Sequence, residues 1–274
     1  MLKSPLNYAG SKHDLMEQLL QHFPSPESVE VFYDVFAGGL SVSINTDYKK
    51  TIANDIIKPL IEFYYNLNRA SKKGLIEEEI SKIKSYSINK ESQEEYNFVR
   101  EDFNKTDNPY QFFALVSSCT NNMMRFNKSF KFNQSFGKRT INESTIQKLK
   151  DYCNVLKDKD IYFSNFNYQD LFKVQPVGKN DFVYLDPPYF AISEAGYNSY
   201  WSKNSEDELY NLIDDLDSKG IRFALSGMSI HKGIPNPNIS KLYKFRIINL
   251  DFNYNKVSRK KNTGESQEIL VVNY

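Results

Sequence analysis

Residues 182–189, Phe182-Val183-Tyr184-Leu185-Asp186-Pro187-Pro188-Tyr189, predict a buried strand that ends at a ligand site. The first four residues are aromatic, β-branched or aliphatic, which is typical of a strand covered on both faces, and the two prolines end it. In open α/β sheets, ligands bind beyond the carboxyl ends of the strands. The simpler alternative is a proline-rich turn that carries a surface aspartate.

The motif Asp186-Pro187-Pro188-Tyr189 suits a flat molecule with an amino group. Two consecutive prolines fix the backbone and remove two N–H donors, which leaves a carboxylate, carbonyl oxygens and an aromatic ring around one small space. The Asp186 carboxylate and the Pro187 carbonyl can accept the two N–H bonds of an exocyclic amine, while the Tyr189 ring stacks on the heterocycle. We therefore expect Asp186, Pro187, Pro188 and Tyr189 to form the catalytic motif.

A second candidate site follows the strand expected over residues 29–35. The turn Asp34-Val35-Phe36-Ala37-Gly38-Gly39 leads into a helix, and a glycine pair there lets a ligand approach the backbone and presents helix N–H groups. The next expected strand, 51–53, ends at Asn54-Asp55, so that Asp55 lies 21 residues after Asp34. Because an acid at this distance binds ribose hydroxyls in Rossmann-like sheets, the spacing predicts a ribose site across the first two strands.

The rest of the chain alternates strands and helices around one long helical region. Residues 7–12 form a tight turn before a helix that Pro24 ends, and residues 59–113 have a charged, helical pattern. Further strands are expected at 161–164, 221–225, 243–250 and 268–272, and helices at 146–155 and 206–217. The last two strands flank the basic loop 256–266, as in a hairpin.

Cations are concentrated in two stretches that contain no acid. A net charge of only +1 argues by itself against a nucleic-acid partner. Residues 120–142, however, contain five cations and no acid, and residues 256–261 form a second such cluster. Amides and arginines between aromatic residues supply the contacts that base edges and phosphates require, which favours nucleic-acid binding over a merely solvated loop.

Length and composition limit the other possibilities. A chain of 274 residues allows one α/β domain with an insertion, or two small domains. No apolar run approaches the length of a membrane helix, and the first residues lack the apolar region of a signal peptide. Cys119 and Cys153 are too few for a disulfide framework or a zinc site, and the three histidines show no ligand spacing. We expect a cytoplasmic protein without a metal or a membrane partner.

The motifs in this order resemble those of the Dam-type (alpha-class) DNA adenine-N6 methyltransferases of bacteria and phages. The matching stretches are 7–12, 34–39, 54–55 and 186–189, and residues 122–127 and 136–139 are similar to the family's target-recognition region. The resemblance implies an α/β fold. A seven-stranded Rossmann-like methyltransferase sheet that binds S-adenosylmethionine (AdoMet), residues 1–56 and 161–274, would carry an inserted, mainly helical DNA-recognition domain, residues 57–160. Only 85 residues follow Tyr189, and the elements expected there use nearly all of them, so the insertion must come earlier.

The resemblance also implies, position by position, two groups of site residues. Those that would line the AdoMet pocket are Tyr8, Ala9, Gly10, Lys12, Asp34, Phe36, Gly38, Gly39, Asp55, Tyr168 and Asp186. Those that would contact DNA are Asn122, Met124, Arg125, Asn127, Lys128, Lys131, Lys138, Arg139, Arg259 and Lys260. Asp55 would hold the ribose hydroxyls. The chain departs from the family at Asn7, where bacterial Dam enzymes have a lysine that helps to read guanine, and at Tyr8, where the bacterial branch has tryptophan.

The implied reaction is methyl transfer from AdoMet to N6 of an adenine that is flipped out of duplex DNA, in GATC or a related short site. The reaction needs little acid–base chemistry, because two acceptors at the amine favour the pyramidal nitrogen that attacks the methyl group. The implied partners are double-stranded DNA and a cognate restriction endonuclease that acts on the same site. We expect a monomer or a weak dimer.

Several alternatives remain open at this stage. The chain could belong to a restriction–modification system with another adenine-containing site, or it could methylate RNA or a protein amide with the same four-residue motif. A catalytically silent DNA-binding relative would be expected to lose Asp186 or the glycine turn, and both are intact. A cytosine-C5 enzyme would need a nucleophilic cysteine, and neither Cys119 nor Cys153 lies in such a motif.

Overall fold

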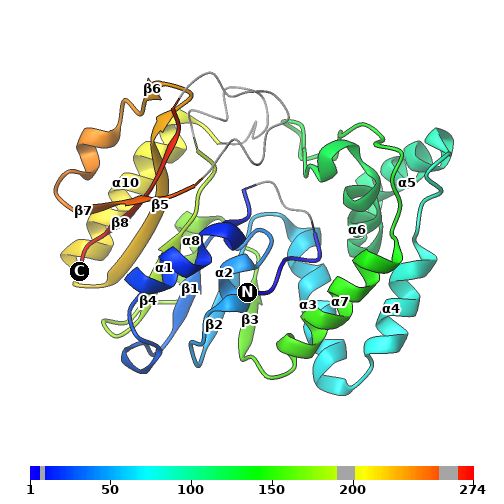
Figure 1. Cartoon of the computed structure of the whole chain (residues 1–274), viewed down its shortest axis with the longest axis horizontal. Helices are drawn as coiled ribbons and strands as arrows, with labels where there is room; N and C mark the ends of the chain where they lie inside the picture. Colours follow the sequence, from blue (N-terminus) through cyan, green and yellow to red (C-terminus); the bar gives the residue numbers. More distant parts are fainter. Residues whose placement is uncertain (7–9, 190–200, 253–264) are drawn as a thin grey trace.

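The computed structural model of the chain has one mainly parallel sheet with helices on both faces and a lobe of further helices beside it (Figure 1). It describes residues 1–6, 10–189, 201–252 and 265–274. The strands among these residues are β1 (Phe32–Asp34), β2 (Thr51–Asn54), β3 (Ile161–Ser164), β4 (Phe182–Leu185), β5 (Arg222–His231), β6 (Ile234–Pro235), β7 (Arg246–Leu250) and β8 (Gln267–Val272).

The order of the strands in the sheet is β3-β2-β1-β4-β5-β8-β7, and β6 pairs with β5 outside this path. The neighbours from β3 to β5 run parallel, whereas β8 is antiparallel to both β5 and β7. The strand order reverses between β1 and β4, which places a topological switch point there. This is a Rossmann-like methyltransferase sheet, as expected from the sequence.

The helices are of three kinds. Those that accompany the sheet are α1 (Met16–His22), α2 (Ser41–Asn45), α8 (Tyr168–Val174) and α10 (Lys203–Ser218). Those between β2 and β3 are α3 (Lys58–Lys73), α4 (Ile76–Ser85), α5 (Gln93–Thr106), α6 (Pro109–Ser118) and α7 (Glu143–Leu156). Short 3-10 turns are η1 (Lys12–Leu15), η2 (Pro26–Ser28), η3 (Thr120–Asn122) and η4 (Ile239–Leu242).

The central strand β4 is buried on both faces, which explains its continuous apolar sequence. Successive side chains of a strand point to opposite faces. Phe182 and Tyr184 pack with residues of α1, whereas Val183 and Leu185 pack with residues of α8 and α10. Both hydrophobic layers therefore hold β4 rigidly, and with it the motif that follows its end.

The helices between β2 and β3 form a lobe at one side of the sheet, drawn in cyan and green in Figure 1. Its α3 packs against both α6 and α7. One hydrophobic cluster runs from Leu40 and Ala53 at the sheet into the centre of the lobe, where Phe63 and Phe113 stack with their ring centroids 4.5 Å apart. The lobe thus shares a core with the sheet. The division into domains at residues 57 and 160 stays a prediction.

The strands expected from the sequence all form; β3 and β4 have the expected bounds, and the others differ at one or both ends. Strand β1 begins at Phe32 instead of residue 29, because Val31 donates its N–H to the Asp181 side chain rather than to a neighbouring strand. Strand β5 continues to His231 because it pairs with β6 and β8. Strand β6, which was not expected, is the eighth strand of the sheet. Strands β7 and β8 form the expected antiparallel pair.

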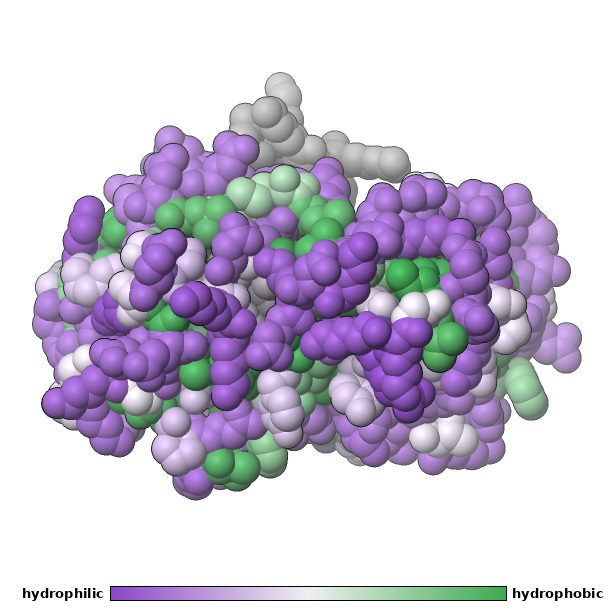
Figure 2. All heavy atoms as spheres, turned by 90° about the horizontal axis from the view of Figure 1, so that it is seen from below, coloured by the Kyte–Doolittle hydropathy of each residue, from purple (hydrophilic) through white to green (hydrophobic). Residues whose placement is uncertain are grey.

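The surface in Figure 2 is mostly hydrophilic, with hydrophobic residues in small separate groups. Among the helices that the structure describes, none has the length and apolar character needed to cross a membrane.

Candidate active site

A cavity of about 700 Å³ opens where β1, β2 and β4 end. Its volume lies within the range of small-molecule and cofactor sites, roughly 300–1,000 Å³. The residues expected at the cofactor and the catalytic motif that line it are Gly10, Lys12, Asp34, Phe36, Gly38, Gly39, Asp55, Tyr168, Asp186, Pro187, Pro188 and Tyr189. Tyr8 and Ala9, also expected there, lie outside the described residues.

The topology of the sheet brings these residues together. Strand β1 lies between β2 and β4 and is parallel to both, so the three carboxyl ends meet at one edge. The side chain of Asn54, at the end of β2, ties the end of β1 to the end of β3. Its amide nitrogen donates to the carbonyls of Val35 and Phe166, both at 3.0 Å, and its oxygen accepts from the Ser164 hydroxyl at 3.0 Å. Asn54 directly precedes Asp55 in the sequence, which gives no sign of this role.

Two buried aspartates hold the glycine turn. Asp55 accepts the N–H of Gly38 at 2.9 Å and that of Ile57 at 2.9 Å, and Asp34 accepts the N–H and the hydroxyl of Ser43 at 3.2 and 2.6 Å. The N–H of Gly38 is therefore donated to a carboxylate of the chain itself. Burial raises the pKa of Asp34 to about 7, and it raises the pKa of Asp55 as well.

Lys12 forms an ion pair with Asp186 inside the cavity. Its Nζ lies 2.8 Å from Asp186 Oδ1 and 5.1 Å from the centre of the Tyr189 ring. Burial alone would lower the pKa of Lys12, but the carboxylates of Asp186 and Glu268 outweigh burial and raise it. Burial raises the pKa of Asp186, and Lys12 opposes that shift. The ammonium group thus occupies one acceptor of the expected catalytic carboxylate in this structure.

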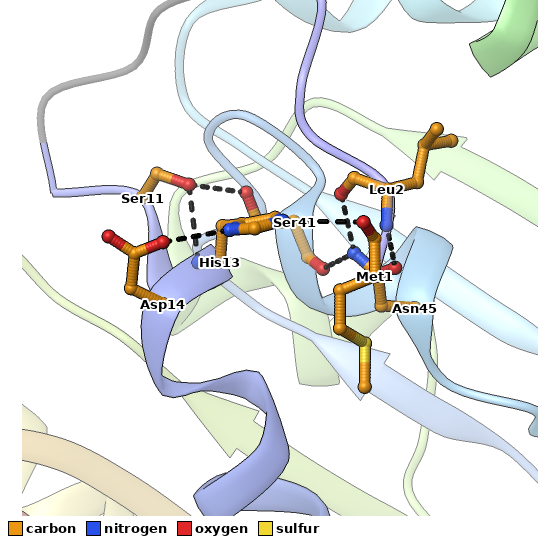
Figure 3. A network of polar contacts seen from close by, with 7 residues as sticks. All are labelled: Met1, Leu2, Ser11, His13, Asp14, Ser41 and Asn45. Carbon is orange, nitrogen blue, oxygen red and sulfur yellow. Dashed lines mark hydrogen bonds and ion pairs between the residues drawn. The ribbon is translucent and has the colours of Figure 1, made fainter.

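Contacts of the N-terminal segment fix the turn that carries Lys12 (Figure 3). The Ser11 and Ser41 hydroxyls are 2.8 Å apart, so the turn is joined to the first residue of α2. Leu2 donates its N–H to the Asn45 side chain at 2.6 Å, and Asn45 donates back to the Leu2 carbonyl at 2.9 Å. The segment before the turn and the turn itself are thus both attached to α2, beside the glycine turn.

Aromatic rings form one wall of the cavity. The ring centroids of Phe36, Tyr168 and Trp201 lie 5.4 to 5.8 Å from one another. The Tyr168 hydroxyl donates to the Ser205 carbonyl at 2.8 Å, which attaches this wall to α10. Trp201 was not expected, because a single tryptophan outside any motif gives no functional signal in the sequence.

The lining of the cavity is strongly acidic. Among the described residues that line it, the basic one is Lys12, and the acidic ones are Asp14, Asp34, Asp55, Asp186, Glu208 and Glu268. This charge favours a cationic ligand over a phosphate. AdoMet carries a sulfonium and an ammonium group beside a flat adenine, so the acidic lining and the aromatic wall fit it.

Residues 122–124 of the helical lobe line the opposite side of the same cavity. Met124, one of the expected DNA contacts, is half-buried there. The Asn122 amide donates to the Val116 carbonyl at 2.9 Å, and Arg139 donates to the Asn122 carbonyl oxygen at 2.5 Å. Both side chains, also expected at DNA, therefore hold η3 against α6 in this structure.

The other expected DNA contacts lie on one loop of the lobe. Those expected contacts are Arg125, Asn127, Lys128, Lys131 and Lys138, and all have exposed side chains. Asn127 accepts the N–H groups of Ser129 and Lys131 at 2.9 and 3.0 Å, and so shapes the turn. The Lys131 ammonium donates to the Asn104 carbonyl at the end of α5. Arg259 and Lys260 lie outside the described residues.

Comparison with known proteins places the chain in a family. Residues 8–263 match the family of D12 class N6 adenine-specific DNA methyltransferases. The chain is 35% identical to modification methylase StsI of Streptococcus sanguinis and 33% identical to type II methyltransferase M.FokI of Planomicrobium okeanokoites. Each alignment covers 100% of this chain and 43% of the relative, so the chain spans less than half the length of either protein.

A shorter relative matches over nearly its whole length. Type II methyltransferase M.CviBI of Paramecium bursaria Chlorella virus NC1A is 26% identical, over 90% of this chain and 93% of the viral protein. The family match covers the cavity from the glycine turn to the Asp186 motif and the helical lobe between them. The chain belongs to the D12 class of N6 adenine-specific DNA methyltransferases.

Proposed function

We propose that this chain transfers a methyl group from AdoMet to N6 of an adenine that is flipped out of duplex DNA. The observation that carries the proposal is the single cavity that joins the glycine turn, the Asp186 motif and residues 122–124 of the helical lobe. A cofactor at the sheet edge and a base held by the lobe would meet at Asp186. Family membership supports this assignment.

AdoMet would lie across the ends of β1 and β2. Asp55 would bind the ribose hydroxyls, the aromatic wall of Phe36, Tyr168 and Trp201 would contact the adenine of the cofactor, and the carboxylates of Asp34 and Asp55 would balance its positive charge. When bound, AdoMet supplies a methyl group made electrophilic by a positively charged sulfur.

The Asp186 motif would orient the target amine. The amine loses conjugation with its ring when Asp186 and the Pro187 carbonyl accept its N–H bonds, and its lone pair becomes available for attack. Tyr189 would stack on the flipped base, since a base in the duplex cannot reach the motif. Lys12 pairs with one oxygen of the Asp186 carboxylate and orients it, and the target amine would donate to that carboxylate.

Cysteine chemistry does not fit this site. Both cysteines are free and buried, and no cysteine is among the described residues that line the cavity. Burial raises the pKa of the Cys119 thiol to about 12, which leaves it protonated and a poor nucleophile. This favours methylation of an exocyclic amine over methylation of cytosine C5.

The target is proposed to be GATC or a related short site within a restriction–modification system. Two similar proteins bear the names modification methylase and type II methyltransferase, which supports this setting. A restriction endonuclease that cuts the same site would be the partner, and the reaction would take place in the cytoplasm.

The test is to express the chain in cells without adenine methylation and to map modified bases in their DNA. We expect N6-methyladenine at one short motif, and none in cells that carry an empty vector. Methylated RNA or protein with unmodified DNA would instead support an RNA or protein amide methyltransferase.

A further inference from the structure

Glu268 lies in the cavity although it belongs to no motif. It is on β8, four strands away from β2 in the order of the sheet, and its side chain is buried. Its Oε2 accepts a hydrogen bond from the Tyr189 hydroxyl at 2.9 Å. Burying a carboxylate is unfavourable unless hydrogen bonds compensate, so its position at this hydroxyl calls for a functional explanation.

The contact with Glu268 fixes the end of Tyr189 that the backbone does not control. Tyr189 follows two prolines, each of which fixes its own φ and so restricts the main chain, but the ring can still rotate about two side-chain torsions. A hydrogen bond to the hydroxyl at the far end of the ring restricts χ1, and so fixes the direction in which the ring points, while rotation of the ring about its own axis is limited by what packs on its face. Lys12, 5.1 Å from the ring centre, packs against the same ring while it pairs with Asp186.

The chain of contacts Glu268–Tyr189–Lys12–Asp186 therefore links the stacking ring to the carboxylate at the amine. We propose that Glu268 is a positioning residue for methyl transfer. It holds the Tyr189 hydroxyl so that the ring meets the flipped base in one orientation, next to Asp186. This inference rests on the proposed function.

A different role for Glu268 would be purely electrostatic, since its carboxylate also acts on the charge of Lys12. Substitutions of Glu268 and Tyr189 distinguish the positioning role from the electrostatic role. Glu268→Gln keeps an oxygen that can accept the Tyr189 hydroxyl but removes the charge, whereas Glu268→Ala removes both. Tyr189→Phe removes the donor and leaves the ring and the Glu268 charge in place.

The experiment compares Glu268→Ala, Glu268→Gln, Tyr189→Phe and the double variant Glu268→Ala/Tyr189→Phe. Each is assayed for kcat and KM in methyl transfer to a duplex and for AdoMet affinity. A duplex with 2-aminopurine at the target base reports stacking through its fluorescence. Tyr210→Phe is the matched control, because Tyr210 donates to the buried Glu206 at 2.9 Å within α10, in an equivalent pair outside the catalytic contacts.

We expect Glu268→Ala and Tyr189→Phe each to lower kcat/KM by about tenfold or more, as for the loss of a hydrogen bond to a charged group. The double variant should lose no more than either single variant, Glu268→Gln should recover to within about threefold of the wild type, and AdoMet affinity should be unchanged. The 2-aminopurine should be less quenched in Glu268→Ala, and Tyr210→Phe should transfer methyl groups at the wild-type rate.

The inference is overturned if Glu268→Gln is as impaired as Glu268→Ala, if Tyr189→Phe stays within about twofold of the wild type, or if the losses of the single variants multiply. Tyr189→Phe and Glu268→Gln change the side-chain volume little, so both variants should fold. They test the positioning role of Glu268 even if Glu268→Ala fails to fold. A wild-type protein that transfers no methyl group to DNA would contradict the proposed function itself, whereas an active wild type with unaffected variants would contradict only the role of Glu268.

Discussion

We expect Asp34 to make AdoMet binding depend on pH. Its carboxyl is buried at the end of β1, and burial raises its pKa to about 7, so it is largely neutral below that pH. A cationic ligand favours the ionised form. AdoMet affinity should therefore rise by up to about tenfold per pH unit between about pH 6 and pH 7 and level off above, with one proton released on binding.

Calorimetry in buffers with different heats of ionisation measures both the affinity and the released proton. Asp34→Asn should flatten this dependence, because the amide does not titrate. If the wild type binds AdoMet with equal affinity at about pH 6 and pH 7, ionisation of Asp34 is not coupled to AdoMet binding.

At the residue scale, sequence could predict chemistry that is local. Asp186 is followed directly by the residues with which it lines the cavity, and Asp55 lies at a fixed distance from the glycine turn, so both could be placed in one site from the sequence. Glu268 could not, because it contacts Tyr189 across 79 residues of sequence. Nor does the sequence show that Arg139 donates to Asn122 within the protein. An arginine in a basic stretch has the same sequence signal whether its side chain contacts DNA or another part of the protein.

At the scale of elements, Gly137 allows the loop that contains the exposed residues Arg125 and Lys138 to pack on the end of α6. A Cβ at this position would lie 2.5 Å from the Cys119 carbonyl carbon and oxygen, and backbone atoms cannot move aside cheaply. Gly137→Ala should therefore destabilise the protein by about 1–3 kcal/mol or more. In Gly227→Ala, the added Cβ meets only the Ile269 side chain, at 3.8 Å.

Urea denaturation of the two variants measures the difference, and AdoMet affinity should be unchanged in Gly137→Ala. If both variants unfold at the same urea concentration, the close approach of Gly137 to Cys119 does not limit the stability of Gly137→Ala.

Elements could be predicted from the sequence where a local signal marks them, such as a continuous apolar run or a helix cap. The apolar run of β4 and the capped helix α7, whose Asn142 accepts the Thr145 N–H at 2.9 Å, both have local signals. The length of β5 could not be predicted, because its last residues pair with β6 and β8. These partners are distant in sequence or too short to recognise.

On the scale of the whole molecule, the sheet and the helical lobe together enclose the cavity, and the lobe presents Arg125 and Lys128 as exposed cations. The sequence predicted that a helical region precedes the catalytic strand. It could not predict that this region shares a hydrophobic core with the sheet, because that core joins residues as distant in sequence as Leu6 and Ile161. Such a common core would hold the base-reading loop at a fixed distance from Asp186.

Arg125 and Lys128 should affect DNA methylation in different ways. An arginine can donate two hydrogen bonds to guanine O6 and N7, so Arg125→Ala should relax discrimination at one guanine position by about 1–3 kcal/mol. Lys128→Ala should weaken binding evenly on all sequences and lower its salt dependence. Methylation rates at fixed ionic strength, on duplexes that differ by single base pairs around the adenine, separate the two effects. A uniform loss in Arg125→Ala would assign Arg125 to a phosphate, and Arg139 would then be tested for base reading.

The most direct test of the whole account is methyl transfer by Asp186→Ala. Labelled AdoMet and a duplex that contains the mapped site are incubated with the wild type and the variant, and AdoMet affinity is measured for both. We predict that the wild type forms N6-methyladenine, and that Asp186→Ala loses about a hundredfold or more of the rate while it still folds and binds AdoMet. A variant that keeps its rate to within about tenfold of the wild type would contradict the role of Asp186 at the target amine.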